Sequence, residues 1–222
     1  MKIKILIIVL AITHYSFSQT VYEVTPGTKG NELTLTVANI SETNPAENVK
    51  VMPPQLLQRR GFQEERITFH QSEQTIERIE PIAEAEVTFT FDISRNVSIT
   101  KKDTIDFMIT DANGLMMTKT FIFSYIGPKE FKLEQNFPNP FNPTTTIQYQ
   151  IPASPNPSKG GAFVSLKIYD ILGSEVVTLV NEEQQPGYYE VEFNASHLAS
   201  GMYVYRLQAG EYISTKKMLM IK

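Results

Sequence analysis

The sequence predicts an all-β protein built from two consecutive β-sandwiches, and three observations lead to this fold class. Apolar residues recur at every second position through much of the chain, while no useful stretch repeats with the period of a helix. Tyr and Phe, which favour pleated and half-buried strands, number 10 and 13 among 222 residues. The candidate strands are short and separated by turn residues, which is typical of a β-sandwich.

The N-terminal end of the sequence, residues 1–18, has the pattern of a signal peptide and is expected to lie outside the fold. Lys2 and Lys4 give it a positive start, and an apolar run without interruption follows over Ile5–Ile12. A transmembrane anchor is the alternative, but these eight residues fall far short of the about 20 that span a bilayer. No other stretch is long and apolar enough, so no transmembrane span is expected.

Small residues flank a large one in Ser16-Phe17-Ser18, which suits cleavage by signal peptidase after Ser18. The mature chain is therefore expected to begin at Gln19. Removing the two leader lysines from 20 basic residues leaves 18 against 24 acidic ones, a net charge near −6, which does not favour nucleic acid as a partner. The chain has no Cys, which excludes a lipoprotein anchor, disulfides and thiolate chemistry.

The first sandwich is expected within residues 19–127. Its clearest strands, in which apolar residues alternate with polar ones, are Leu33–Val37, Ala85–Phe91 and Ile105–Ile109. Asn113-Gly114 tolerates positive φ and predicts a hairpin whose second arm is Met116–Tyr125. The stretch Asn44–Gln74 is less regular and is expected to hold short strands and loops.

Gly127-Pro128 marks the boundary to a second sandwich, expected over residues 128–222. It opens with the Pro- and Asn-rich stretch Asn136–Pro143, whose prolines exclude helix and central strand. This stretch is expected to be an ordered loop pinned by Phe137 and Phe141. Six or seven strands are expected in this half, at 145–151, 164–168, 175–180, 188–193, 202–209 and 212–221 among others.

Five motifs follow one another in a fixed order in this second half. They are LEQNFPNPFNPTT at Leu133–Thr145, VSLKIYDILG at Val164–Gly173, Gly187–Tyr189 before a strand, LASGMYVYRL at Leu198–Leu207, and the ending Ser214–Met218. Together they closely resemble, over residues 131–222, the type A C-terminal sorting domain of the bacterial type IX secretion system. The residues taken as the sorting motif are Asn136, Pro138, Asn139, Pro140, Phe141, Asn142, Pro143, Gly173, Gly187, Gly201, Tyr203, Lys216 and Lys217. A long loop at Pro152–Gly161 is the one departure.

This resemblance implies an Ig-like sandwich that serves as an export address. After export to the periplasm by the Sec machinery, such a domain is read by the outer-membrane translocon and its sorting and attachment machinery. In the family the domain is often removed, and the cargo is anchored to surface polysaccharide or released. Residues 20–127 are similar to the Ig-like modules common ahead of such domains, in NELTLTVAN and in TDANG with FIFSYIGP. The location implied is secreted or on the outer cell surface.

No catalytic, cofactor or metal site is expected. His70 and His197 are the only histidines of the mature chain, one in each sandwich, which does not favour a two-histidine site or a histidine relay. Paired carboxylates for glycoside hydrolysis stay open because acids are abundant, although Glu84 and Glu86 fall on the wet face of a strand. Asp111–Gly114 is similar to the start of a calcium loop, but the remaining ligands are missing, so a hairpin turn is preferred.

Three functions remain after this reading. The preferred one is a non-enzymatic Ig-like module with a sorting address, a structural or interaction protein. The alternative is a carbohydrate-binding or adhesive module on the same export route, which an exposed row of aromatic residues would favour. The third is the tail of a longer enzyme, against which the signal peptide argues. The partner of residues 19–127 is not indicated by the sequence.

Overall fold

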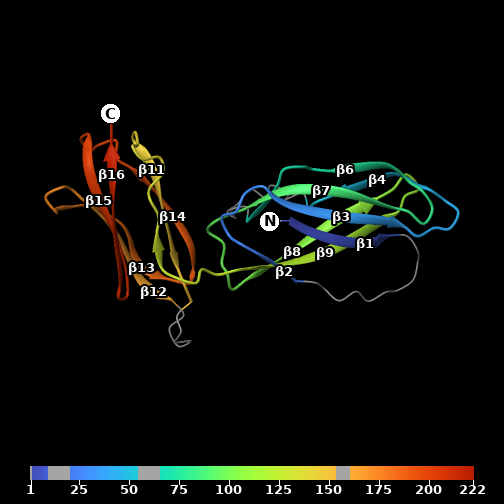
Figure 1. Ribbon diagram of the computed structural model, residues 1–222, viewed down its shortest axis with the longest axis horizontal. Helices are drawn as coiled ribbons and strands as arrows, with labels where there is room; N and C mark the ends of the chain where they lie inside the picture. Colours follow the sequence, from blue (N-terminus) through green and yellow to red (C-terminus); the bar gives the residue numbers. More distant parts are fainter. Residues whose placement is uncertain (1, 10–20, 55–65, 154–160) are drawn as a thin grey trace. The chain divides into compact units, whose positions relative to one another are not determined.

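The computed structural model describes residues 2–9, 21–54, 66–153 and 161–222, and every regular element in these ranges is a β-strand (Figure 1). The predicted all-β class is thereby confirmed. The chain divides into two compact units. Unit 1 comprises Met1–Ser94 with Thr100–Tyr125, and unit 2 comprises Arg95–Ile99 with Ile126–Lys222. In the described part of the chain, no helix is long and apolar enough to cross a membrane.

Unit 1 is a sandwich of two sheets. One sheet has the order β1-β3-β7-β5, formed by β1 (Lys2–Val9), β3 (Asn31–Asn39), β7 (Glu84–Ile93) and β5 (Ile67–Phe69). The other has the order β2-β9-β8-β4-β6, formed by β2 (Val21–Val24), β9 (Met116–Tyr125), β8 (Lys102–Thr110), β4 (Ala46–Met52) and β6 (Gln74–Ile79). Aromatic pairs join the layers, with ring centroids 5.2 Å apart for Phe89 and Phe107 and 5.7 Å for Phe91 and Phe123.

The predicted hairpin is present in unit 1. β8 and β9 run antiparallel, with Thr110 opposite Met116, and Gly114 has a φ of +87° in the turn between them. The Asp111 carboxylate accepts hydrogen bonds from the backbone N–H groups of Asn113 (2.9 Å) and Leu115 (2.8 Å), so it closes the turn as the hairpin interpretation requires.

Residues 2–9 differ from the expectation that the leader lies outside the fold. In the uncleaved chain they form β1, which pairs parallel with β3 from Lys2 opposite Glu32 to Val9 opposite Asn39. An extended segment placed there satisfies the outer backbone groups of β3, and Lys2 Nζ lies 3.0 Å from Glu32 Oε2. Cleavage after Ser18 stays a prediction, because Ser18 lies outside the described residues.

Unit 2 is also formed by two sheets, here with seven strands in the described residues. The first has the order β10-β11-β14, formed by β10 (Lys132–Leu133), β11 (Thr144–Ile151) and β14 (Gly187–Asn194). The second has the order β13-β12-β15-β16, formed by β13 (Glu175–Gln184), β12 (Ala162–Tyr169), β15 (Gly201–Ala209) and β16 (Tyr212–Met220). Most of the long loop predicted at Pro152–Gly161 lies outside the described residues.

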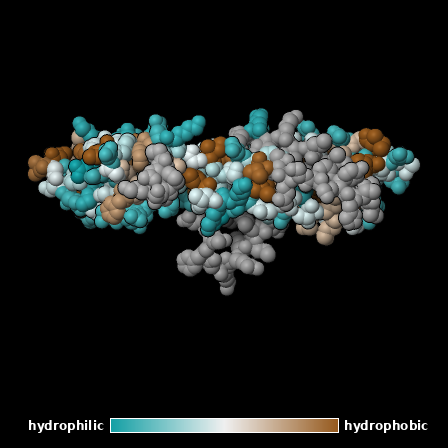
Figure 2. Space-filling view, turned by 90° about the horizontal axis from the view of Figure 1, so that it is seen from below, coloured by the Kyte–Doolittle hydropathy of each residue, from teal (hydrophilic) through white to brown (hydrophobic). Residues whose placement is uncertain are grey.

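The core of unit 2 is apolar and includes buried tyrosines whose hydroxyl groups are bonded. Tyr149 is fully buried, and its hydroxyl group donates to Gln184 Oε1 at 2.9 Å. Alternation places Ile147, Tyr149 and Ile151 of β11 inside, as the sequence pattern predicts. Among the residues that Figure 2 colours, most of this face is hydrophilic, and the hydrophobic residues form small separate patches.

Candidate functional site

The candidate site is built around the Pro- and Asn-rich loop, residues 134–143, which connects β10 to β11. Its peptide bonds Phe137–Pro138 and Asn139–Pro140 are cis. Two isolated bridges fix it, one antiparallel between Phe137 and Thr146 and one parallel between Phe141 and Met220. The predicted ordered loop is therefore confirmed, and it is held by strands at both ends of the domain sequence.

The two phenylalanines of the loop have different roles. Phe141 is 1% exposed and packs in the core, with its ring centroid 6.1 Å from that of Phe193. Phe137 is 80% exposed and holds the loop only through backbone hydrogen bonds with Thr146, both 3.0 Å long. Both residues therefore hold the loop as predicted, Phe141 through its buried side chain and Phe137 through its backbone, while the Phe137 side chain points outward.

Asn136 is the polar centre of the loop and is 2% exposed. Its side-chain Nδ2 donates to Pro138 O at 3.0 Å and to Thr145 Oγ1 at 2.9 Å. The Thr145 hydroxyl group in turn donates to Pro138 O at 2.8 Å. Gln135 Nε2 donates to Asn136 Oδ1 at 2.7 Å, so both ends of the buried amide have partners.

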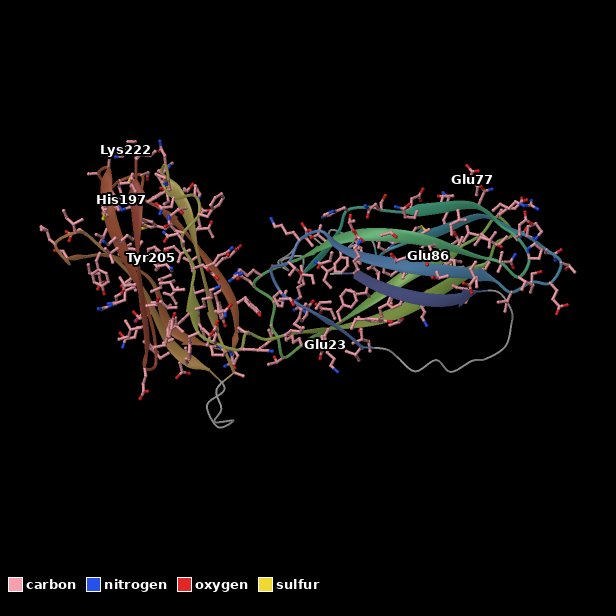
Figure 3. All side chains as sticks on the ribbon, viewed as in Figure 1. Glu23, Glu77, Glu86, His197, Tyr205 and Lys222 are labelled. Carbon is pink, nitrogen blue, oxygen red and sulfur yellow. The ribbon has the colours of Figure 1, made fainter. Side chains whose placement is uncertain are left out.

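Tyr205 of β15 connects this loop to the core. Its hydroxyl group accepts the backbone N–H of Asn136 and donates to Glu134 O, each at 2.8 Å. Burial raises the pKa of Tyr205 to about 12, and the hydrogen bond from Asn136 opposes this rise. The phenol therefore stays protonated at neutral pH and keeps its donor role. Figure 3 shows Tyr205 inside unit 2.

The last strand closes the loop from the other side. Asn139 Oδ1 accepts the N–H of Leu219 at 2.9 Å, although 80 positions separate the two residues in the sequence. Phe141 N–H donates to Leu219 O, and Ile221 N–H donates to Phe141 O, both at 3.0 Å. Gln135 Nε2 also donates to Lys217 O at 2.8 Å. The opening motif and the chain ending are thus joined into one structure.

We call the loop 134–143, with the strand ends Gly201–Tyr205 and Lys217–Ile221, the C-terminal cluster. Gly201 lies opposite Met220 and Tyr203 opposite Met218, so both belong to it. Tyr203 is nearly buried, and its hydroxyl group donates to Ala199 O at 2.9 Å. The large apolar side chains that the cluster exposes are Phe137, Met202, Leu219 and Ile221.

The structure places the other residues of the sorting motif as follows. Asn142 is exposed, and Pro143 O accepts the N–H of Ala195 at 2.9 Å. Lys216 precedes the cluster on β16. Gly173 and Gly187 lie outside it, in the turn between β12 and β13 and at the start of β14. The structure therefore brings together most of the motif residues, but not Lys216 and these two glycines.

Gly173 has a local role that its position explains. Its φ is +86°, and its N–H donates to Asp170 O at 3.1 Å. The Asp170 carboxylate accepts the N–H groups of Leu172 and Ser174, both at 2.9 Å. This turn orders the β12–β13 connection.

Sequence reasoning did not single out Thr145, Tyr205, Leu219 or Ile221 as site residues. Each lies within or beside a quoted motif, but its contacts depend on partners that are dozens of positions away or on an outward-facing strand position. No signal in the sequence alone assigns those pairings.

The described residues contain no cluster of side chains arranged for acid–base or metal chemistry. His70 Nε2 lies 3.3 Å from Asp92 Oδ1 at a partly exposed position of unit 1, whereas His197 belongs to unit 2. Among the residues that the structure describes, the buried polar side chains are uncharged and are Asn31, Asn39, Asn136, Thr145 and Gln184. Within the described ranges, no group of three or more His, Cys, Asp or Glu residues has a geometry that would hold a metal ion.

Comparison with solved structures gives only distant likenesses. The Pseudomonas aeruginosa CupB2 chaperone matches at 13% identity and a TM-score of 0.32, covering 90% of this chain and 96% of that one. Dimeric latent PorU from Porphyromonas gingivalis matches at 15% identity and a TM-score of 0.32, covering 94% of this chain but only 19% of PorU. The human desmocollin-1 ectodomain matches at 9% identity and a TM-score of 0.28, covering 90% and 35%. These likenesses support no functional conclusion.

Comparison with families is decisive for the second half of the chain. No curated protein matches the sequence. The family model described as "Secretion system C-terminal sorting domain" matches residues 135–222, the part of the chain that contains nearly all of the C-terminal cluster. Residues 135–222 of this chain are therefore a C-terminal sorting domain of the type IX secretion system.

Proposed function

We propose that this chain is a non-enzymatic protein that reaches the cell surface or the medium in two export steps. Residues 1–18 direct it through the Sec machinery to the periplasm and are removed by signal peptidase. The sorting domain then directs the mature chain through the outer-membrane translocon to the sorting and attachment machinery. The sorting-domain match over residues 135–222 is the observation that carries this proposal.

The C-terminal cluster supports a physical account of how the address is read. Buried hydrogen bonds of Asn136, Thr145 and Tyr205 fix the shape of the loop. The fixed loop then presents exposed apolar side chains, of which Phe137 is the most exposed at 80%. A rigid scaffold with projecting apolar groups is suited to binding another protein, because little ordering entropy is lost on association. We assign the exposed side chains of the cluster to contact with the export machinery.

Unit 1 supports an interaction or structural role over carbohydrate binding. In the described part of unit 1, every aromatic side chain is buried or partly buried, so no exposed aromatic row is available for stacking on sugars. Anchoring to surface polysaccharide is instead proposed for the sorting step itself, where removal of the domain leaves the cargo attached or released.

The location is tested by fractionating a bacterium that has the type IX system and expresses the full chain. Protein at the surface or in the medium is expected in the competent strain, and periplasmic retention is expected in a matched strain without the translocon. The intact mass of the exported protein should correspond to a chain that begins at Gln19. Equal export from both strains would contradict the proposed route, and a mass that retains residues 1–18 would contradict leader removal.

The absence of enzymatic activity has its own test. Purified residues 19–222 are assayed against glycosidase, protease and esterase substrates. No turnover is expected, because no described acidic or histidine side chain lies in a buried constellation. Turnover that a single acidic substitution abolishes would overturn this part of the proposal.

A further inference from the structure

The outer strands of each sheet differ in how well they are protected against pairing with another chain. Short strands, charged side chains and irregular pairing all discourage such pairing. Three outer strands are short, namely β5 with three residues, β2 with four and β10 with two. Four others carry charged pairs, which are Glu77 and Arg78 on β6, Glu182 and Glu183 on β13, Glu190 and Glu192 on β14, and Lys216 and Lys217 on β16. β13 also shows register shifts against β12.

β3 is different, because among the described strands only β1 covers its outer edge (Figure 1). It is nine residues long and pairs with β7 without a register shift from Asn31 to Ala38. Its only charged residue is Glu32, close to one end. β1 belongs to residues 1–18, so the present inference rests on the leader removal in the proposed function. Once β1 is gone, β3 becomes the longest outer strand without such protection in the described part of unit 1.

The backbone groups that would be left open can be identified. Asn39 N–H donates to Ala83 O at 2.8 Å. Because Ala83 directly precedes β7, Asn39 bonds on the β7 side of β3. Successive residues of an antiparallel strand direct their N–H and C=O groups to opposite sides. Leu35 and Val37 therefore bond toward β7, while Thr34 and Thr36 direct their backbone groups to the edge that β1 covers.

We propose that in the mature protein this edge pairs antiparallel with the same edge of a second copy of the chain. A register centred on Leu35 places Leu33 opposite Val37 and Thr34 opposite Thr36 of the other copy. Both threonines direct backbone groups to the edge, so they form a hydrogen-bonded pair in this register. The buried side chains of Leu33, Leu35 and Val37 continue the core layer across the pair.

Charge also fits this pairing. Glu32 of one copy lies opposite Ala38 of the other, so no two like charges face each other. The strand is therefore self-complementary under a two-fold axis, which is the symmetry that most homodimers have. The eight consecutive residue pairs between β1 and β3 show that the edge accepts an extended strand over nearly its whole length.

The test uses the protein expressed from Gln19 to Lys222 and two matched double variants. Thr34→Lys with Thr36→Lys places Lys opposite Lys twice across the interface. Thr34→Glu with Thr36→Lys places Glu opposite Lys twice. Both variants lose the 3.0 Å bond between the Thr34 and Thr88 hydroxyl groups, and both carry the Thr36→Lys change opposite Glu86 within the chain. They therefore differ only in the charge at position 34.

Sedimentation velocity at about 1 to 100 μM is expected to show a dimer for the wild-type protein and for the Glu/Lys variant. The Lys/Lys variant is expected to dissociate with a Kd raised by about tenfold or more. Urea unfolding of each protein verifies that all three are folded.

A wild-type protein that stays monomeric across this range would overturn the proposal, as would equal dimerisation of the two variants. A monomer that instead binds an added eight-residue strand peptide would assign the edge to a different protein. Because the protein starts at Gln19, failure here leaves the two-step export route intact, and the mass of the exported chain tests that route separately.

Discussion

Replacing Asn136 by Ala removes the two hydrogen bonds that its Nδ2 donates to Pro138 O and Thr145 Oγ1 at a position that is 2% exposed. Pro138 O keeps the hydroxyl group of Thr145 as a donor. Gln135 Nε2 loses its acceptor, Asn136 Oδ1, but Gln135 is exposed and water can replace that acceptor. The net loss is therefore two buried hydrogen bonds, which corresponds to about 2 kcal/mol in the free energy of unfolding of unit 2. In a domain of this size, about 2 kcal/mol lowers the Tm by roughly 10 °C.

Hydrogen-exchange mass spectrometry in increasing urea measures this effect, because peptides from each unit report on that unit separately. Peptides from residues 161–222 should lose about 2 kcal/mol of protection, while peptides from unit 1 keep theirs. Asn142→Ala is the matched control, because Asn142 is an exposed residue of the same loop and its loss should cost less than about 0.5 kcal/mol.

Coupling to Thr145 sharpens the test. Thr145→Val removes the hydroxyl group that both accepts from Asn136 and donates to Pro138 O. The double variant should therefore be destabilised by at least about 0.5 kcal/mol less than the sum of the single variants. If Asn136→Ala matches the Asn142→Ala control, or if the two effects simply add, the buried network does not hold the loop.

Three further predictions, the first with Gly187→Ala as its matched control, concern unit 2. Gly173→Ala should lower the free energy of unfolding of unit 2 by about 1 kcal/mol, because φ is +86° there, although a Cβ would meet no atom within 4 Å. Gly187→Ala should cost less than about 0.5 kcal/mol in the same urea titration, because its Cβ would lie in ordinary contact 3.5 Å from the Tyr189 ring. Burial raises the pKa values of Tyr149 and Tyr205 to about 12, above the value of about 10 in the unfolded chain, so the stability that they contribute should be complete below pH 10 and should fall as the pH rises toward 12. Absorbance titration of the tyrosines together with urea unfolding at each pH measures this, and unchanged stability over that range would contradict it. Phe137→Ser should leave stability unchanged, because the side chain is 80% exposed, but should reduce export in a competent host; undiminished export would remove Phe137 from the recognition surface.

Local patterns in the sequence were sufficient for most strands and turns. Alternation in Leu33–Val37 and Ala85–Phe91 identified β3 and β7, because the pleat forces one face inward. Asn113-Gly114 identified the β8–β9 turn, because Gly114 takes the positive φ that the turn requires. The prolines of Asn136–Pro143 identified an ordered loop by excluding regular structure.

Long-range pairings were not accessible to the same reasoning. Nothing in the sequence near Asn139 indicates that its side chain bonds Leu219, 80 positions later. Phe137 and Phe141 lie in the same Pro- and Asn-rich stretch. Composition alone therefore does not show which of the two side chains is buried and which is exposed. The pairing of residues 2–9 with β3 was not predicted either, because an apolar run does not indicate which strand edge it will meet.

Transfer of residues 131–222 to an unrelated cargo tests the sorting function most directly. These residues are fused behind a signal peptide and a fluorescent reporter in a bacterium with the type IX system, with a translocon-deficient strain as the control. The reporter should reach the outside of the competent cells. Trimming residues 216–222 should retain it in the periplasm, because Leu219 and Ile221 then no longer bond Asn139 and Phe141. An intact fusion that stays periplasmic in the competent host, or a trimmed fusion that is still exported, would contradict the assignment of these residues as the export address.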